Sequence, residues 1–276
     1  MIDFLNGNII DAEDGHLKGR RWQRFMDIHC HCLPGLDDGP DTMAHAVGLC
    51  RMLAEEGFTT VVATPHQLGR FEASNEAAMV RESVNGLNET LTNGGIPINI
   101  VPGGEVRVDE RICRLLESDR ILTLADGGKY MLLELPYQVF IDIEPMLIEL
   151  ASMGIQSVIS HAELIAPLVA RPEMVRKWLE CSNHLQITAA SLVGDLGPEV
   201  QKIALSFIES GKATLVATDS HNTNIRRPRM RAAYELISTR FGEDLANLVC
   251  IENPSRIVNC QDILSVSLYE QQKEDR

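Results

Sequence analysis

Short apolar runs alternate with longer amphipathic segments along the chain, a pattern typical of α/β folds built on a parallel sheet. The apolar runs predict strands in "MDIH", "TTVVATPH", "INIVPGGEV", "YMLLELP", "IQSVISHAE", "HLQITAAS", "ATLVATDSH" and, as an eighth, "LVCIENP". Apolar positions that recur every three or four residues predict helices over residues 41–56, 74–93, 109–118, 143–153, 172–181, 198–210 and 229–240.

Seven or eight strand–helix units in one domain favour a closed or nearly closed barrel. In a barrel of this kind, the residues that perform chemistry gather at the carboxyl ends of the strands. An open, doubly wound sheet is the alternative. The chain lacks the glycine-rich loops with which such sheets bind nucleotides, so the barrel is favoured.

The predicted strand ends repeatedly carry a histidine or a carboxylate. Any one of these residues alone is more often a hydrogen-bonded structural residue or an ion-pair partner. Their recurrence at the same end of successive strands predicts that they converge on one mouth of the barrel. The residues in question are His66, Glu105, Glu134, His161, Asp219 and His221.

The first strand ends in the stretch "MDIHCHCLPGLDDGPDT", which is rich in metal-binding side chains. Side chains alternate between the two faces of a strand, so His29 and His31 share one face, and Cys30 and Cys32 share the other. This spacing favours two imidazoles facing one ion over a zinc site made by all four residues. Two hydrogen-bonded histidines in a turn are an equal alternative for this stretch alone.

The combined set of histidines and carboxylates suits divalent ions such as Mn²⁺, Fe²⁺ and Zn²⁺. It contains more ligands than one ion needs, and burying so many unpaired carboxylates would be costly. Bridging acids that hold metals roughly 3.5–4 Å apart resolve both problems. The pattern therefore predicts a multinuclear hydrolytic site, with a geometry suited to phosphoryl transfer to water.

Composition narrows the class of protein further. The 276 residues, 45% of them hydrophobic, can bury one large core, and no low-complexity linker divides them. The net charge of −14 disfavours binding to nucleic acid. The odd number of cysteines, seven, without framework spacing, indicates reduced thiols. We find no membrane-spanning run and no signal-peptide core, so a cytoplasmic protein is expected.

Six ordered motifs carry a resemblance to a known family: "DIHCHCLPGLDDGPDT", "ATPHQLGRFE", "PGGEVRVD", "LLELP", "SHAE" and "ATDSHNTNIRRPRM". Over residues 26–254 the chain resembles the CpsB/CapC family, the bacterial protein-tyrosine phosphatases of capsule and exopolysaccharide operons with a PHP (polymerase and histidinol phosphatase) domain. The resemblance implies a single-domain, distorted (β/α)7 TIM-like barrel of PHP type. It also implies three divalent ions, usually Mn²⁺, with Fe²⁺ or Zn²⁺ as alternatives.

The resemblance also assigns the site residues. It selects Asp38 over its neighbour Asp37, which spacing alone could not do. It places Arg226 in the catalytic site, where a guanidinium would neutralise charge on the phosphate; an ordinary solvated basic loop is the alternative there. The implied metal ligands are His29, His31, Asp38, His66, Glu105, Glu134, His161, Asp219 and His221.

Two positions depart from the family pattern. Leu164 stands where members commonly have an arginine after "HxE", so a second phosphate-binding arginine is missing. Arg70, in the loop that follows His66, is a candidate to compensate. Gln67 replaces a histidine often found next to His66, and we do not count this position as a ligand.

The implied substrate is a phosphotyrosine protein, namely the autophosphorylating tyrosine kinase that controls polysaccharide chain length and export. A PHP-type phosphatase acting on a small phosphomonoester is the alternative, which the change at Leu164 supports. A non-catalytic, metal-stabilised regulatory protein ranks last, because all nine ligand positions are filled. The expected organisation is an N-terminal extension over 1–25, the phosphatase domain over 26–262 and a polar tail over 263–276. The sequence predicts no oligomeric state.

Overall fold

The computed structural model describes residues 2–3, 8–9, 24–72, 75–181 and 183–265. The strands are β1 (Ile2–Asp3), β2 (Asn8–Ile9), β3 (Phe25–Cys30), β4 (Phe58–Ala63), β5 (His66–Gln67), β6 (Asn99–Pro102), β7 (Glu105–Arg107), β8 (Tyr130–Glu134), β9 (Gln156–Ile159), β10 (His184–Thr188) and β11 (Leu215–Ala217). Most of the predicted extension, 1–25, and residues 266–276 of the predicted tail lie outside the described residues.

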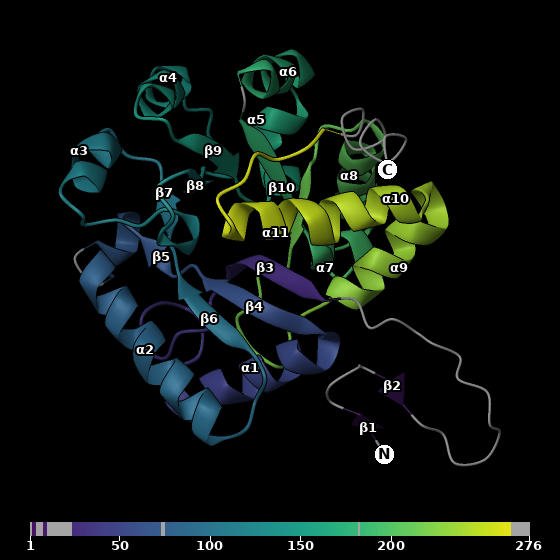
Figure 1. The fold of residues 1–276 in the computed structure, drawn as a ribbon. Helices are drawn as coiled ribbons and strands as arrows, with labels where there is room; N and C mark the ends of the chain where they lie inside the picture. Colours follow the sequence, from purple (N-terminus) through teal and green to yellow (C-terminus); the bar gives the residue numbers. More distant parts are fainter. Residues whose placement is uncertain (1, 4–7, 10–23, 73–74, 182, 266–276) are drawn as a thin grey trace.

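The helices surround the strands in the ribbon view (Figure 1). They are α1 (Met43–Glu56), α2 (Ala77–Asn93), α3 (Ile112–Glu117), α4 (Glu144–Ser152), α5 (Ala166–Val169), α6 (Pro172–Glu180), α7 (Ala189–Val193), α8 (Pro198–Glu209), α9 (Met230–Phe241), α10 (Glu243–Asn247) and α11 (Asn253–Val258). Single turns are η1 (Gly69–Phe71), η2 (Leu124–Asp126), η3 (Ala162–Leu164) and η4 (Leu248–Glu252). No helix that the structure describes is both long and apolar enough to cross a bilayer.

The first long helix shows how sequence sets these boundaries. Thr42 caps α1, since its side-chain oxygen accepts a hydrogen bond from the backbone N–H of His45. Leu49 and Leu53, four residues apart, are buried on the same face. The helix ends at Gly57, whose φ of 100° lies in the left-handed region that favours glycine.

All seven clear strand predictions are confirmed, although two of the predicted runs are each broken into two strands. The run "TTVVATPH" forms β4 and β5 with Pro65 between them, and "INIVPGGEV" forms β6 and β7 on either side of two glycines. The eighth prediction, "LVCIENP", is wrong, because these residues form η4 and the start of α11. A short buried apolar run has no period that distinguishes a strand from a helix.

The strands after β2 pair in parallel in two sheets, one in the order β3-β4-β6 and the other in the order β11-β10-β9-β8-β7-β5. The carboxyl end of β3 also meets the end of β11, where Cys30 and Ser220 form an isolated parallel bridge. There the N–H of His31 donates to the carbonyl of Ser220 (2.9 Å). The result is a mixed α/β domain in which the ends of the parallel strands lie together.

A small apolar cluster inside the strands positions the site. Leu132 of β8 and Ala217 of β11 belong to this cluster, and Glu134 and Asp219 follow them two residues later along the chain. Ile257 of α11 packs into the same cluster with Tyr130, the first residue of β8. Helix α11 therefore covers the amino ends of the strands, and the polar residues occupy the opposite ends.

Candidate metal centre

The two histidines at the end of β3 point to one site, as predicted. Their Nε2 atoms lie 3.2 Å apart. Cys30 and Cys32 are fully buried in the main apolar core, away from the site, and all seven cysteines are free. The prediction that the histidines share one face of the strand end and the cysteines the other is therefore confirmed.

The structure brings the predicted ligands together. Eight of the nine fall into three overlapping groups, within each of which the ligand atoms lie within 4.8 Å of one another. The groups share His31 and His66. They are His31, Asp38, His66 and His221; His29, His31 and Asp219; and His66, Glu105 and Glu134. The ninth residue, His161, belongs to none of these groups but contacts Glu105.

Glu105 lies at the centre of the histidines and is almost fully buried. Its Oε2 is 3.4 Å from Nε2 of His29, 3.4 Å from Nε2 of His31 and 3.1 Å from Nδ1 of His66. Its Oε1 is 2.9 Å from Nε2 of His161. One carboxylate thus joins side chains from β3, β5 and the end of β9.

Asp38 and Asp219 form the second acidic part of the site. Asp38 Oδ1 lies 3.3 Å from Nε2 of His221 and 3.4 Å from Nε2 of His66. Asp219 Oδ1 lies 3.5 Å from Nε2 of His29 and 3.6 Å from Nε2 of His31. Oε2 of Glu134 lies 3.7 Å from Nδ1 of His66, so every predicted ligand is within ion-pair distance of at least one other predicted ligand.

The rings of three histidines are held in place by a partner at Nδ1, so that Nε2 faces the site. Nδ1 of His29 is 2.9 Å from Oε1 of Gln186, Nδ1 of His31 is 2.6 Å from Oδ2 of Asp37, and Nδ1 of His221 is 3.0 Å from the carbonyl of Asp219. An acceptor at Nδ1 fixes a proton there, so that the neutral form of the ring presents its lone pair at Nε2, which is the usual arrangement of metal-binding histidines.

Two buried imidazole nitrogens also favour a metal-binding site. Nδ1 of His161 is buried and has no hydrogen-bond partner among the described residues, and the buried Nε2 of His221 makes no well-aligned hydrogen bond there, although Oδ1 of Asp38 lies 3.3 Å away. Burial, followed by the nearby charge of His31, lowers the pKa of His221 to about 4, so this imidazole is neutral. Neutral imidazoles with a free lone pair, beside several carboxylates, fit a divalent metal ion.

Strained backbone occurs at two of the site residues. His161, just after β9, has a φ of 33°, and Asp219, just after β11, has a φ of 51°. Residues other than glycine adopt these left-handed conformations rarely, and they cluster at functional sites. Both side chains are aimed into the site at this cost in backbone energy.

Charges set the protonation of the cluster. Burial lowers the pKa of His29, but the charges of Glu105 and Asp219 outweigh it and raise the pKa to about 9. Burial likewise opposes the rise in the pKa of His66 to about 10, which hydrogen bonds with Asp38 and Glu105 cause. Burial raises the pKa of Glu105, yet the charge of His29 outweighs it and holds that pKa well below its usual range.

We therefore expect metal binding to release protons. Below pH 9 the rings of His29 and His66 are protonated on both nitrogens in the metal-free protein. A metal ion binds only the neutral ring. Binding at pH 7.5 should release about two protons from this pair, and apparent affinity should rise with pH. Calorimetric titration with Mn²⁺ in two buffers of different ionisation enthalpy measures the number. Observed binding heats that are equal in the two buffers, before any correction for buffer ionisation, would mean that no proton is released and would contradict this protonation state.

Sequence reasoning missed several residues around the site. Asp37 is not in any of the ligand groups; it orients His31 and accepts a hydrogen bond from the backbone N–H of His66. Its position next to Asp38 was the only signal for such a role. Gln186, in the middle of β10, accepts hydrogen bonds from His29 and from the N–H of His161. No motif marked it, because a buried strand glutamine resembles any core polar residue.

A cavity of about 600 Å³ opens beside the ligands. Arg70, Arg107 and Arg226 line it, together with the rings of Phe71 and Tyr137. Arg107 was not predicted, although it lies in the motif "EVRV"; its Nη1 is 3.0 Å from Oε1 of Glu134.

Arg226 and Arg70 flank Asp38 at the cavity. Nη2 of Arg226 donates to both carboxylate oxygens of Asp219 at 2.9 Å, and its Nη1 lies 3.7 Å from Asp38. Nη2 of Arg70 donates to Asp38 at 3.1 Å. Leu164, at the position of the missing arginine, ends η3 and does not line this cavity.

Comparison with known proteins agrees with this site. The model of the family described as "Capsular polysaccharide synthesis, CpsB/CapC" matches residues 25–259. The tyrosine-protein phosphatase YwqE of Bacillus subtilis is 31% identical over 87% of this chain and 93% of its own length. The tyrosine-protein phosphatase CpsB of Streptococcus agalactiae is 28% identical over 85% of this chain and 98% of its own.

A solved structure gives the same result. It comes from work on YwqE from Bacillus subtilis and CpsB from Streptococcus pneumoniae, described as unique metal-dependent tyrosine phosphatases. It superposes with a TM-score of 0.83 at 31% identity, and the match covers 87% of this chain and 96% of that one. The chain therefore belongs to the CpsB/CapC family of capsular polysaccharide synthesis.

Proposed function

We propose that this chain is a metal-dependent phosphatase that hydrolyses phosphotyrosine in a protein. The observation that carries the proposal is the convergence of three overlapping ligand groups on a cavity that is lined by three arginines and two aromatic rings. Two relatives that match this chain over nearly their whole length are tyrosine-protein phosphatases, which supports the same activity.

The proposed cofactors are three divalent ions, with Mn²⁺ as the first choice and Fe²⁺ or Zn²⁺ as alternatives. The three groups of ligands would hold them, with His31 and His66 each serving two groups and His161 adding a ligand beside Glu105. Divalent ions in such a site neutralise charge on the phosphoryl group and activate water as the nucleophile.

The arginines are proposed to bind the phosphate. A guanidinium presents two parallel N–H donors that match phosphate oxygens. Arg226 is held by Asp219 and Arg70 by Asp38, and both line the cavity, so both can turn donors toward a bound phosphate. Arg70 would thereby supply the second cationic contact that Leu164 cannot provide.

The aromatic rings are proposed to accept the tyrosine side chain. Phe71 stacks on His66 with ring centroids 5.3 Å apart, and Tyr137 meets His161 edge-on at 5.2 Å. Both rings line the cavity beside the ligands, where a phenyl ring could pack against them. Because phenol has a pKa of about 10, the leaving group needs little protonation, and we assign no general acid.

The proposed substrate protein is the autophosphorylating tyrosine kinase of a polysaccharide export system, in the cytoplasm. A small phosphomonoester is the second candidate, and Leu164 favours it because one family arginine is absent. A non-catalytic regulatory role ranks last, since every proposed ligand position is filled.

For the fold, we propose the distorted (β/α)7 barrel of PHP type over residues 26–262. Counting β4 with β5 and β6 with β7 as single broken strands gives seven parallel strands. The pairing of β4 with β6 and of β5 with β7 joins the two sheets, and the bridge between Cys30 and Ser220 supports closure at the other side.

A substrate panel tests the proposed activity. The purified protein with Mn²⁺ is assayed on phosphotyrosine peptides, phosphoserine peptides and small phosphomonoesters, with and without chelator. We expect the highest kcat/KM on phosphotyrosine peptides and no turnover after chelation. Preference for a small phosphomonoester would select the second candidate. Bound metal without hydrolysis of any substrate would support the regulatory role.

We expect Arg226→Ala to lower kcat/KM on phosphotyrosine peptides about 10²-fold, because it removes a preorganised donor to the transferred phosphoryl group. Arg226→Lys should recover only part of this loss, since an ammonium cannot bind two oxygens in parallel. Steady-state kinetics with equal metal content measure the effect. Arg227→Ala, the same change at the neighbouring position, is the control. Equal activity of the two alanine variants would remove the proposed role of Arg226.

A further inference from the structure

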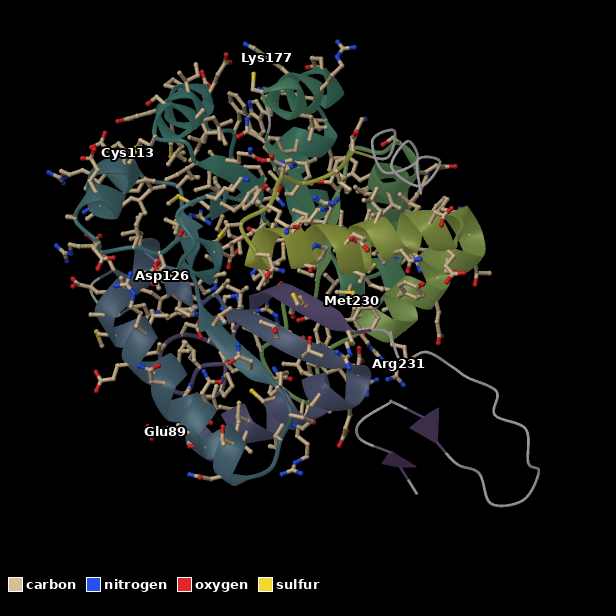
Figure 2. All side chains as sticks on the ribbon, viewed as in Figure 1. Glu89, Cys113, Asp126, Lys177, Met230 and Arg231 are labelled. Carbon is tan, nitrogen blue, oxygen red and sulfur yellow. The ribbon has the colours of Figure 1, made fainter. Side chains whose placement is uncertain are left out.

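A second cavity, of about 350 Å³, lies between the first turns of α3 and α4. Its floor is apolar, with Ile112 and Ile143 almost completely buried. Carboxylates surround it, from Glu110, Asp142 and Glu149. Helices α3 and α4 lie side by side in Figure 1, and Figure 2 labels Cys113 of α3, which also lines the cavity.

This cavity opens on the same rim of the domain as the proposed active site. Helices α3 and α4 follow β7 and β8, so their first turns lie at the carboxyl ends of those strands. Arg107 lines the active-site cavity, and the next residue, Val108, lines the second one. The N–H of Val108 donates to the carbonyl of Glu134 at 3.1 Å, which fixes the two cavities beside each other.

An exposed apolar segment connects the two cavities. After β8 the chain passes from Tyr137 at the active-site cavity to Ile141 at the second cavity. Val139, between them, is 62% exposed, and Phe140 and Ile141 are each 41% exposed. Exposed apolar side chains that run together in this way are typical of a binding surface.

Charge distinguishes the two ends of this surface. Arginines line the active-site end, whereas Glu110, Asp142 and Glu149 surround the far end. A fourth lining carboxylate, Asp109, is paired with Arg111. Glu110, Asp142 and Glu149 form no ion pair with a residue that the structure describes, and only Asp142 Oδ1 accepts a backbone hydrogen bond, from Glu144, so charge remains available to a cation from outside. A ligand that matches the whole surface carries a phosphate at one end and an apolar group beside a positive charge at the other.

We propose that the cavity between α3 and α4 binds an apolar side chain, flanked by lysine or arginine, of the polypeptide that carries the phosphotyrosine. This inference rests on the proposed function and adds sequence selectivity to it. The chain from Tyr137 to Ile141 spans at most about 14 Å, which an extended peptide covers in about four residues. The recognised residue therefore lies within about four positions of the phosphotyrosine.

Matched phosphotyrosine peptides test the proposal. One series carries isoleucine next to lysine at two, three or four positions on either side of the phosphotyrosine; a second series has serine in place of isoleucine, and a third has glutamate in place of lysine. We expect the best isoleucine–lysine peptide to exceed its serine counterpart about tenfold in kcat/KM. The advantage of lysine over glutamate should shrink as salt is added.

Two single substitutions then locate the binding site. Ile141→Asp should reduce the preference for isoleucine over serine from about tenfold to about one, because it places a carboxylate in the apolar cavity. Ile148→Asp is the control, since Ile148 is 63% exposed on α4 and lies outside the cavity. Both side chains are exposed, so both variants should fold.

The outcomes separate this inference from the proposed function. Equal, measurable rates on all phosphotyrosine peptides would overturn the binding site and leave the phosphatase activity standing. A preference that survives Ile141→Asp would overturn its location. Hydrolysis of small phosphomonoesters without hydrolysis of any phosphotyrosine peptide would overturn both the proposed function and this inference.

Discussion

Glu105→Gln is expected to reduce kcat/KM on phosphotyrosine peptides by about 10³-fold, equivalent to about 4 kcal/mol of lost transition-state stabilisation. The carboxylate contacts the side chains of His29, His31, His66 and His161, so it links four of the other proposed ligands. Glutamine has the same shape but no charge. The buried histidines then lose the anion that balances a bound cation, and metal content should fall with activity.

The measurement pairs kinetics with metal analysis on the same sample. Circular dichroism should show an unchanged fold, because the replacement is nearly isosteric. Glu117→Gln, an exposed position at the end of α3, is the matched control and should keep wild-type activity and metal content. Full metal occupancy and full activity in Glu105→Gln would contradict the role given to the central carboxylate.

Removal of metal from the wild-type protein provides an independent check of the same site. A ligand present at a hundredfold excess over its Kd stabilises the folded state by about 2.7 kcal/mol. Chelation should therefore lower Tm as well as abolish activity, and Mn²⁺ should restore both. An unchanged Tm with complete loss of activity would mean that the ions bind too weakly to contribute to stability.

Most of the proposed ligands could be predicted from sequence because they lie at or close to the ends of runs that are recognisable as strands. Parallel strands end at one rim of the domain. Glu134 and Asp219 illustrate this, since each lies two residues beyond an inward-facing core residue. The resemblance to the family was needed to choose Asp38 over Asp37, because a loop has no period that assigns side-chain directions.

The surrounding residues could not be predicted because their roles depend on packing. The resemblance selects Asp38 over Asp37 as a ligand, and the role of Asp37 as the partner of His31 follows only from the fold of the loop. Gln186 supports His29 from a strand distant in sequence, and Arg107 pairs with Glu134 across two neighbouring strands. Contacts of this kind are set by strand order and register, which a single sequence does not state.

The incorrect strand at "LVCIENP" has a related cause. Leu248, Val249 and Cys250 are all buried, so the run is apolar on every side and shows neither a strand period nor a helix period. Pro254, which appeared to end a strand, lies in the first turn of α11, where proline is well tolerated.

Gly39→Ala is expected to destabilise the fold by about 3 kcal/mol and to lower kcat/KM by more than about 10²-fold. A Cβ at this position would lie 2.4 Å from the backbone carbonyl oxygen of His31 and 3.0 Å from Oδ1 of Asp37. Backbone cannot move aside as a flexible side chain would. The loop must shift, and with it Asp38 and the partner that orients His31.

Thermal denaturation and steady-state kinetics measure the two parts of this prediction, and a metal titration follows the proposed site itself. Gly86→Ala is the matched control: it makes the same change inside α2, where a Cβ would meet no atom within 4 Å. Alanine is favoured over glycine within a helix, so this variant should be more stable by about 0.5–1 kcal/mol and fully active. If Gly39→Ala matched Gly86→Ala in Tm and in metal affinity, the loop would tolerate displacement. The close approach of Gly39 to His31 would then not be what holds Asp37 and Asp38 at the site.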